Sequence, residues 1–277
     1  MKDKIIFWID NSLIYFGLAK SLQEKYDCEL YAIFDIVDKP KKIQNQQFVK
    51  FHKVWYYHDY ISKRKSEPDL EYLKYIEKKY KLNLWTIAYN DRIFYQFNNF
   101  YKFSSNEVLL IIEEECKLFE SIIDEIKPDF LIIPRAPLRE SCVFLQICKC
   151  KGVKILFLAT NRLGNKCIIS NGDESLGYVN NESIRSDKTF EDLQRYREQH
   201  DLYNQLKIDS SKFLNSRSSM VKAFCKFFFS KSSNQKSHYT YYGRTKLRVL
   251  FFYLLDILRT KYRKKFIEKF ISSRFTF

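Results

Sequence analysis

The segment Phe130-Leu-Ile-Ile-Pro-Arg-Ala-Pro-Leu-Arg-Glu-Ser-Cys-Val-Phe-Leu-Gln-Ile-Cys-Lys-Cys-Lys-Gly-Val-Lys-Ile-Leu-Phe-Leu158 carries the clearest fold signal in the chain. Two apolar runs flank a segment with helical periodicity, 138–150: 130–133 is continuous, and 153–158 is broken only by Lys154. Short continuous apolar runs are typical of strands buried on both faces of a parallel sheet. Lys151-Gly152 is a typical helix end, because glycine readily adopts the left-handed conformation that follows a last helical turn. The segment therefore predicts a strand–helix–strand unit.

The same alternation continues towards the N-terminus. It predicts an α/β fold, with a Rossmann-like parallel sheet and helices on both faces, over residues 1–185. Residues 186–277 are predicted to form a helical, basic, aromatic-rich extension. Further strands are expected at 5–9, 29–34 and 48–57 and helices at 12–26, 68–80 and 106–126, while 84–88 fits either kind of element.

The positive charge is concentrated in the C-terminal part of the chain. All 277 residues together have a formal net charge of +15. Residues 211–277 hold 16 Lys and Arg against 2 acidic residues, whereas residues 1–210 hold 32 against 31. Such an asymmetry is typical of a near-neutral folded body whose extension meets something anionic.

Composition excludes several classes of protein. A hydrophobic fraction of 45% with only 6 Gly and 5 Pro excludes a disordered or collagen-like chain. No run reaches the roughly 18 apolar residues of a membrane span. The start of the chain, 1–10, has no signal-peptide pattern, so a cytoplasmic location is expected.

Motifs for cofactors and metals are missing from the sequence. There is no G-x-G-x-x-G after the first strand, no phosphate-binding G-x-x-x-x-G-K-[ST] and no G-x-S-x-G. Most of the seven cysteines lie in apolar runs and are interpreted as core side chains in a reducing compartment. Cys148-Lys-Cys150 has neither a second pair nor a nearby histidine, so no metal site is expected.

The candidate site lies in the loops that follow the predicted strands. In parallel α/β sheets, ligands bind at the carboxyl ends of the strands. A carboxylate there, Asp10, is a candidate general base, although it also suits a helix N-terminus. Arginines can hold phosphates or carboxylated sugars there, or pair with nearby acids. The candidate binding residues are Asn11, Ser12, His58, Arg135, Arg139, Glu140, Arg162 and Asn165.

Several of these segments resemble a known family. Pro128-Asp-Phe-Leu-Ile-Ile-Pro134, the helix at 138–150, Lys151-Gly-Val-Lys154 and Arg162-Leu-Gly-Asn-Lys166 are similar to the amino-terminal domain of capsular polysaccharide biosynthesis proteins. These are GT-B-type glycosyltransferases of bacterial surface carbohydrates. Lys166 stands where the family usually has arginine. The Tyr-, Lys- and Arg-rich segment from Tyr239 to Phe270 resembles the family's interdomain segment, so the resemblance covers most of the chain.

The resemblance implies an enzyme half. It implies transfer of a sugar from a nucleotide-sugar donor, a substrate rather than a cofactor, to a glycan or lipid-linked acceptor. The family's second, donor-binding Rossmann-like domain has no counterpart in this sequence, so a separate donor-binding chain is one expected partner. The alternative is a non-catalytic truncated form that binds a membrane or a partner chain through its basic C-terminal helices.

Residues 244–274 allow three interpretations. They carry ten basic and two acidic residues around the apolar centre Val249-Leu-Phe-Phe-Tyr-Leu-Leu255. Positions 247, 250, 251, 254, 255 and 258 share one helical face. The first interpretation is a helix that lies on the anionic inner face of the cytoplasmic membrane. The second is an interdomain helix packed on protein, and the third is a nucleic-acid surface. Nucleic acid is the least favoured, because the near-neutral body has no RNA-binding signature.

Overall fold

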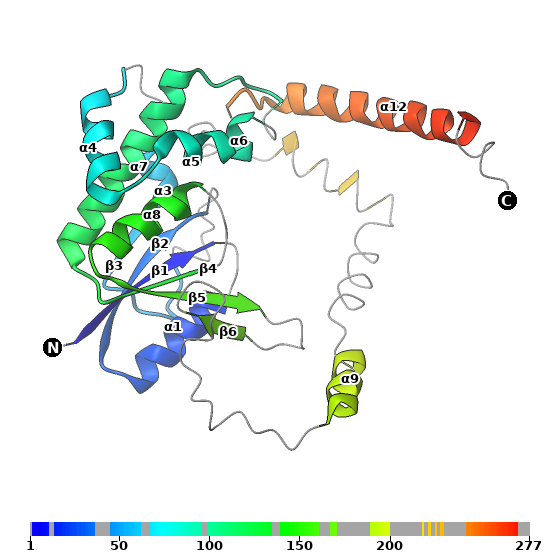
Figure 1. Ribbon diagram of the computed structural model, residues 1–277. Coiled ribbons are helices and arrows are strands. Elements are labelled where there is room, and N and C mark those ends of the chain that lie inside the picture. The colour runs from blue at the N-terminus through cyan, green and yellow to red at the C-terminus, as the bar shows by residue number, and fades with distance from the viewer. Residues whose placement is uncertain are drawn as a thin grey trace.

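A computed structural model describes residues 2–10, 14–36, 45–61, 67–95, 99–134, 139–160, 167–170, 189–199, 218, 221–222, 225, 228–229 and 242–270. Its centre is a six-stranded sheet in the order β3-β2-β1-β4-β5-β6 (Figure 1). The strand order reverses direction between β1 and β4. The strands are β1 (Asp3–Ile9), β2 (Cys28–Phe34), β3 (Lys53–Tyr56), β4 (Phe130–Pro134), β5 (Lys154–Thr160) and β6 (Cys167–Ser170).

The sheet is mostly parallel, which confirms the predicted α/β class. β1 pairs in parallel with β2 and β4, and β2–β3 and β4–β5 are also parallel. Only β6 runs antiparallel, at the edge beside β5. The division of the chain at residue 185 stays a prediction.

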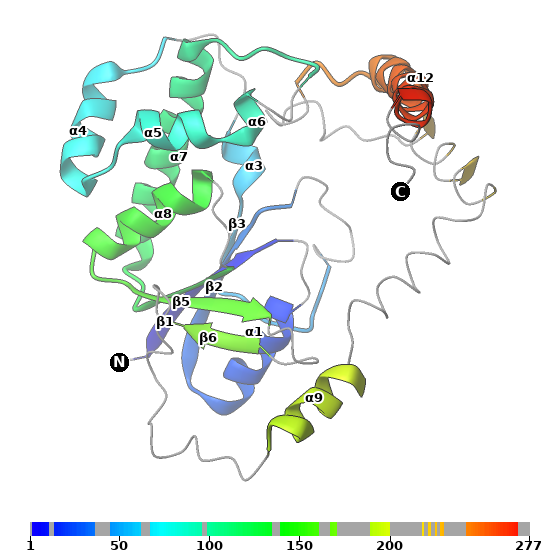
Figure 2. The same ribbon diagram turned by 45° about the vertical axis from the view of Figure 1, so that its right-hand side comes forward.

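Alternate residues of the strands build two cores, one on each face of the sheet. Ile6 and Trp8 of β1 join the larger core beneath α7 and α8, whereas Phe7 and Ile9 join a smaller core with α1. Figure 2 shows α1 on one side of the sheet and the other body helices on the opposite side. This two-sided burial explains why the strands are continuously apolar in sequence.

The helices of the body begin and end close to their predicted positions. Ser104 caps α7 with a complete capping box with Glu107, and Lys127 ends it in the left-handed conformation. The ambiguous segment at 84–88 is helical, because Asn83 caps it and its Leu84 and Ala88 face the larger core. The body helices are α1 (Ile14–Lys25), α3 (Tyr57–Tyr60), α4 (Leu70–Tyr80), α5 (Leu84–Asn90), α6 (Arg92–Tyr95), α7 (Ser105–Ile126) and α8 (Arg139–Cys150).

The third strand is shorter than the sequence pattern predicts. The pattern suggested 48–57, but β3 spans only Lys53–Tyr56, and Tyr57 begins the short helix α3. His52 lies before the strand, where its Nδ1 accepts a hydrogen bond from Leu30 N at 3.2 Å. Residues 48–51 instead form an irregular segment, in which Val49 is buried in the smaller core, Phe51 packs against that core and Phe48 is exposed.

Helices α9 (Phe190–Gln199) and α12 (Lys246–Phe270) lie outside the body. The turn before α12 is fastened to the segment before α7. Tyr242 is buried and stacks on Phe103, and the Arg244 guanidinium lies over the Phe100 ring at 5.2 Å. In the described part of the chain, no helix has both the length and the apolar character to cross a membrane.

Candidate functional site

The carboxyl ends of β1, β2 and β3 bring polar residues together. The register pairs Ile9 with Phe34 and Phe34 with Tyr56. The residues that follow, Asp10 and Asp35, therefore lie beside one another, and Asp35 N donates a hydrogen bond to Ile9 O at 2.8 Å. Tyr57 and His58 follow β3 at the same edge. This edge is where a parallel α/β sheet places its ligands.

His58 and Asp35 form a pair at this edge. His58 Nε2 lies 2.9 Å from Asp35 Oδ1, and both side chains are largely shielded from solvent. The pair joins the end of β2 to α3, so the short helix that replaces the end of the predicted strand sets the position of the imidazole. An imidazole held by a carboxylate has a defined orientation, which a proton-transfer or substrate-binding group needs.

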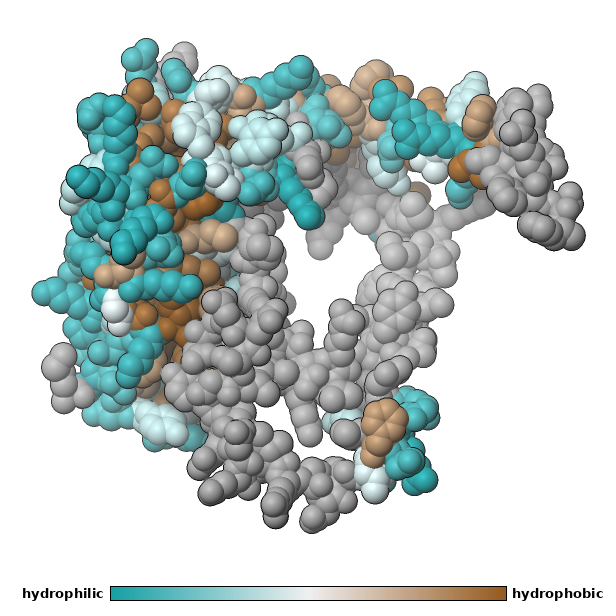
Figure 3. Space-filling model, in the orientation of Figure 1, coloured by the Kyte–Doolittle hydropathy of each residue, from teal (hydrophilic) through white to brown (hydrophobic). Residues whose placement is uncertain are grey.

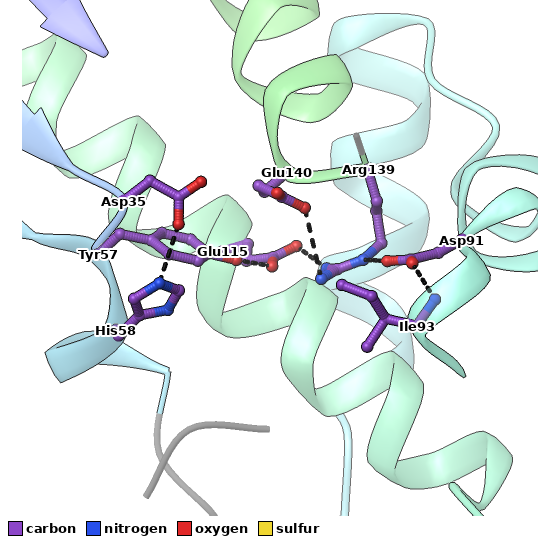
Figure 4. A network of polar contacts seen from close by, with 8 residues as sticks. All are labelled: Asp35, Tyr57, His58, Asp91, Ile93, Glu115, Arg139 and Glu140. Carbon is purple, nitrogen blue, oxygen red and sulfur yellow. Dashed lines mark hydrogen bonds and ion pairs between the residues drawn. The ribbon is translucent and has the colours of Figure 1, made fainter. Parts of the chain in front are cut away.

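Next to this pair lies a buried network centred on Arg139 (Figure 4). Arg139 Nε donates to Asp91 Oδ2 at 2.7 Å, and its Nη1 donates to Glu115 Oε2. Its Nη2 lies 3.8 Å from Glu140 Oε2, a longer ion-pair contact. Glu115 Oε1 accepts a further hydrogen bond from the Tyr57 hydroxyl. The network therefore links α8, α5, α7 and α3 in the interior.

Local structure explains how the network assembles. Arg139 is the first residue of α8, and Asp91 is the C-cap residue that directly follows α5. Asp91 Oδ1 also accepts a hydrogen bond from Ile93 N at 2.8 Å, which fixes the carboxylate for Arg139. The guanidinium lies 4.8 Å from the centroid of Phe94 on α6, a cation–π contact. Arginine suits this position, because its planar fork can serve several acceptors at once.

The network holds more acidic groups than basic ones. One guanidinium faces Asp91, Glu115 and Glu140. Burial raises the pKa of Glu115, and the positive charge of Arg139 opposes that rise. Burial also raises the pKa of Glu140 to about 8, with smaller contributions from the negative charges of Asp35 and Glu115. Burial therefore favours the protonated form of Glu140, whose contact with the Arg139 guanidinium is the longest of the three.

Glu140 is the least satisfied member of the group. Its side chain is only 5% exposed, and its Oε2 accepts no hydrogen bond from the residues that the structure describes. Figure 4 shows it between the Asp35–His58 pair and Arg139. A protonated buried carboxyl group can donate a hydrogen bond to a ligand, as an ionised one cannot.

The predicted site residues divide into two sets. His58, Arg139 and Glu140 belong to the adjoining pair and network, and Asp10 lies at the end of β1 and is partly buried. Arg139 donates hydrogen bonds to two protein carboxylates, those of Asp91 and Glu115. Its role as a ligand contact stays a prediction. The other candidates lie outside the described residues: Asn11, Ser12, Arg135, Arg162 and Asn165.

Sequence reasoning missed Asp35, Tyr57, Asp91 and Glu115 as site residues. Glu115 was detectable, because it shares a helical stripe with the apolar residues Ile111, Leu118 and Ile122, where an acidic residue is out of place. Asp35 follows a predicted strand and carried the same signal as Asp10. Asp91 carried no such signal, because the contact between α5 and α8 joins residues that are 48 positions apart.

Within the described residues, no group of three or more His, Cys, Asp or Glu is arranged to hold a metal ion. A scan of protein-family models finds no match to this chain, and a search of curated proteins finds no significant match. The site must therefore be judged on its own geometry.

Proposed function

We propose that this chain is the acceptor-side half of a GT-B-type glycosyltransferase of bacterial surface polysaccharide synthesis. The described sheet is then the Rossmann-like half of that fold. One observation carries the proposal: Asp10, Asp35, His58 and Glu140 converge at the carboxyl edge of the parallel sheet, beside the reversal of strand order. The resemblance of 128–170 to the capsular enzymes supports it.

The proposed reaction transfers a sugar to a hydroxyl group of the acceptor. Asp10 accepts the proton of that hydroxyl, and the oxygen forms a bond to the anomeric carbon of the donor sugar. The bond between that carbon and the diphosphate oxygen breaks, and its electron pair leaves with the nucleoside diphosphate. The pKa of Glu140, raised to about 8, favours its protonated form, so Asp10 rather than Glu140 is the proposed base. In the proposed complex, Glu140 donates a hydrogen bond to the acceptor, and the Asp35–His58 pair orients the acceptor.

The experiment measures transfer of radiolabelled sugar from nucleotide-sugar donors to glycan and lipid-linked acceptors. We expect transfer by the wild-type chain, combined with a donor-binding chain, and a loss of about a hundredfold or more in Asp10→Asn. Glu71→Gln is the matched control, because Glu71 is an exposed acid on α4 far from this edge. Absence of transfer by the wild-type chain, both alone and combined with a donor-binding chain, would contradict the proposal. Equal rates in Asp10→Asn and Glu71→Gln would also contradict it.

A second candidate is a non-catalytic protein that acts by binding. The observation that favours it is the exposure of α12, which extends from the body in both ribbon views (Figures 1 and 2). A wild-type chain that binds a membrane or a partner chain through its basic C-terminal helices, but transfers no sugar with any donor-binding chain, would favour this function over the first.

A further inference from the structure

The first half of α12 has an apolar stripe that faces away from the protein. Leu247, Phe251, Leu254 and Leu258 recur at intervals of three and four residues, so they share one side of the helix. Their exposed fractions are 71%, 60%, 51% and 53%. This stripe is therefore not packed on the described body, and the interpretation of the segment as an interdomain helix stays a prediction.

A different side of α12 holds it to the body. Phe252 contacts the Phe100 ring edge-to-face, with 5.0 Å between centroids. The helix follows Gly243, where an added Cβ would collide with the Phe100 carbonyl group, so the turn lies tightly against this segment. At 100° per residue, Phe252 points about 130° away from the centre of the exposed stripe. The contact with the body therefore orients the stripe outward.

The second half of α12 is exposed all round and is rich in basic side chains, among which Tyr262, Phe266 and Ile267 are also exposed. Every residue from 256 to 268 is exposed. The basic residues there are Arg259, Lys261, Arg263, Lys264, Lys265 and, one position beyond, Lys269, against the acidic Asp256 and Glu268. Figure 3 shows hydrophilic and hydrophobic side chains together at the surface of this helix.

We propose that α12 is a docking helix for the surface of an anionic phospholipid bilayer. The exposed leucines and Phe251 enter the boundary between headgroups and acyl chains, and the basic half binds the anionic headgroups. Charge complementarity commits the helix to an anionic surface, and the leucine stripe distinguishes a bilayer from nucleic acid, which binds through phosphates and stacked aromatic rings. The helix lies on the bilayer and does not cross it, since its charges exclude a span.

The test is cosedimentation of the full chain with vesicles. One set contains phosphatidylcholine alone, and the other contains phosphatidylcholine with about a third phosphatidylglycerol. We expect the partition coefficient to be at least about tenfold higher on the anionic vesicles and to fall steeply as salt rises. Equal binding to both vesicles, or binding to neither, would overturn the proposal.

Two pairs of variants locate the binding surface. Leu258→Gln should lower partitioning onto anionic vesicles several-fold. Leu70→Gln is the matched control, because it removes an equally exposed leucine (53%) from α4 of the body, and it should have no such effect. Lys264→Glu with Lys265→Glu should abolish most binding, whereas the same reversal at the exposed Lys78 and Lys149 of the body should have little effect. Circular dichroism checks that each variant is folded. Equal losses in a variant and its control would overturn the assignment to α12.

A competition arm separates the bilayer from nucleic acid. Oligonucleotides are added at the same salt concentration, and their own binding is measured with Leu258→Gln. Tighter binding to oligonucleotide than to vesicles, unchanged by Leu258→Gln, would overturn the proposal in favour of a nucleic-acid surface. The assay involves no sugar transfer, so its outcome is independent of the proposed enzyme activity.

Discussion

Arg139 Nε donates a hydrogen bond to Asp91 Oδ2 across 2.7 Å, and this bond joins the start of α8 to the end of α5 in the protein interior. The same guanidinium binds Glu115 of α7. Three helices that cover one face of the sheet are therefore held together by one buried cation. The helices also carry Glu140 towards the Asp35–His58 pair, so the network sets the geometry of the candidate site.

Removal of the Arg139 guanidinium should lower the stability of the folded protein. Arg139→Met leaves Asp91 and Glu115 buried without a positive partner, and we expect the free energy of unfolding to fall by about 3–5 kcal/mol. Urea denaturation measures the change. Lys74→Met is the control, because Lys74 forms a solvent-exposed pair with Glu71 and should have little effect. A similar small loss in both variants would show that the Arg139 network does not stabilise the fold.

Glu140 should make the protein less stable as pH rises. Its pKa is raised to about 8 by burial in the folded state, while the unfolded chain loses the same proton near pH 4.5. Between these values the folded state binds more protons, so its stability falls with rising pH, by up to about 1.4 kcal/mol per unit. Glu140→Gln removes this dependence. We expect the variant to match the wild type near pH 5 and to be more stable at pH 9.

Urea denaturation at pH 5, 7 and 9 tests this prediction. The groups that face Glu140 are Arg139, Asp35 and Glu115, and they remain in the variant. Glu71→Gln should follow the wild-type profile, because Glu71 is exposed. Parallel profiles for wild type and Glu140→Gln would show that Glu140 is ionised in the folded protein at neutral pH.

The turn before α12 should not tolerate a side chain. Gly243 has φ +73°, and a Cβ there would collide with the Phe100 carbonyl group. Gly152 is a matched control, with φ +77° and no atom within 4 Å of an added Cβ. Both alanine variants carry the backbone penalty of about 1–2 kcal/mol, but only Gly243→Ala should displace the turn. Hydrogen exchange of 99–103 and 242–252 should rise in Gly243→Ala alone, and an equal rise in both would refute the close packing.

The two cysteines of the Cys148-Lys-Cys150 pair should differ in reactivity. Cys148 is buried, and burial raises the pKa of its thiol, whereas Cys150 is exposed. Because the thiolate is the reactive form, iodoacetamide should label Cys150 and spare Cys148 in the folded protein. Mass-spectrometric mapping measures the labelling, and unfolding in urea should equalise the two. Equal labelling of the native protein would argue against the packing of α8.

Most of the sheet could be predicted because burial on both faces leaves a local trace. The runs at 5–9, 29–34, 130–133 and 153–158 all became strands within two residues of their expected bounds. The segment at 48–57 failed, because its apolar residues are equally suited to irregular packing against α1. The strand order and the antiparallel β6 were beyond local reasoning, since both depend on pairing between distant segments.

The candidate site was predictable only as a location. Asp10, His58, Arg139 and Glu140 all follow or adjoin predicted strands, and the last three lie in one polar region. Their partners were not chosen, because Asp91 and Glu115 lie on helices rather than after strands. The roles of these residues in substrate binding stay predictions.

The sequence alone determined the α/β class, the helices that begin and end at clear signals, and the concentration of positive charge after residue 210. Each of these follows from neighbouring residues, whose spacing and side chains act locally. Tertiary structure decided which acids share Arg139, which carboxyl group keeps its proton, and which side of α12 is left exposed. These features depend on burial and on contacts between residues far apart in the chain, so no local pattern contains them.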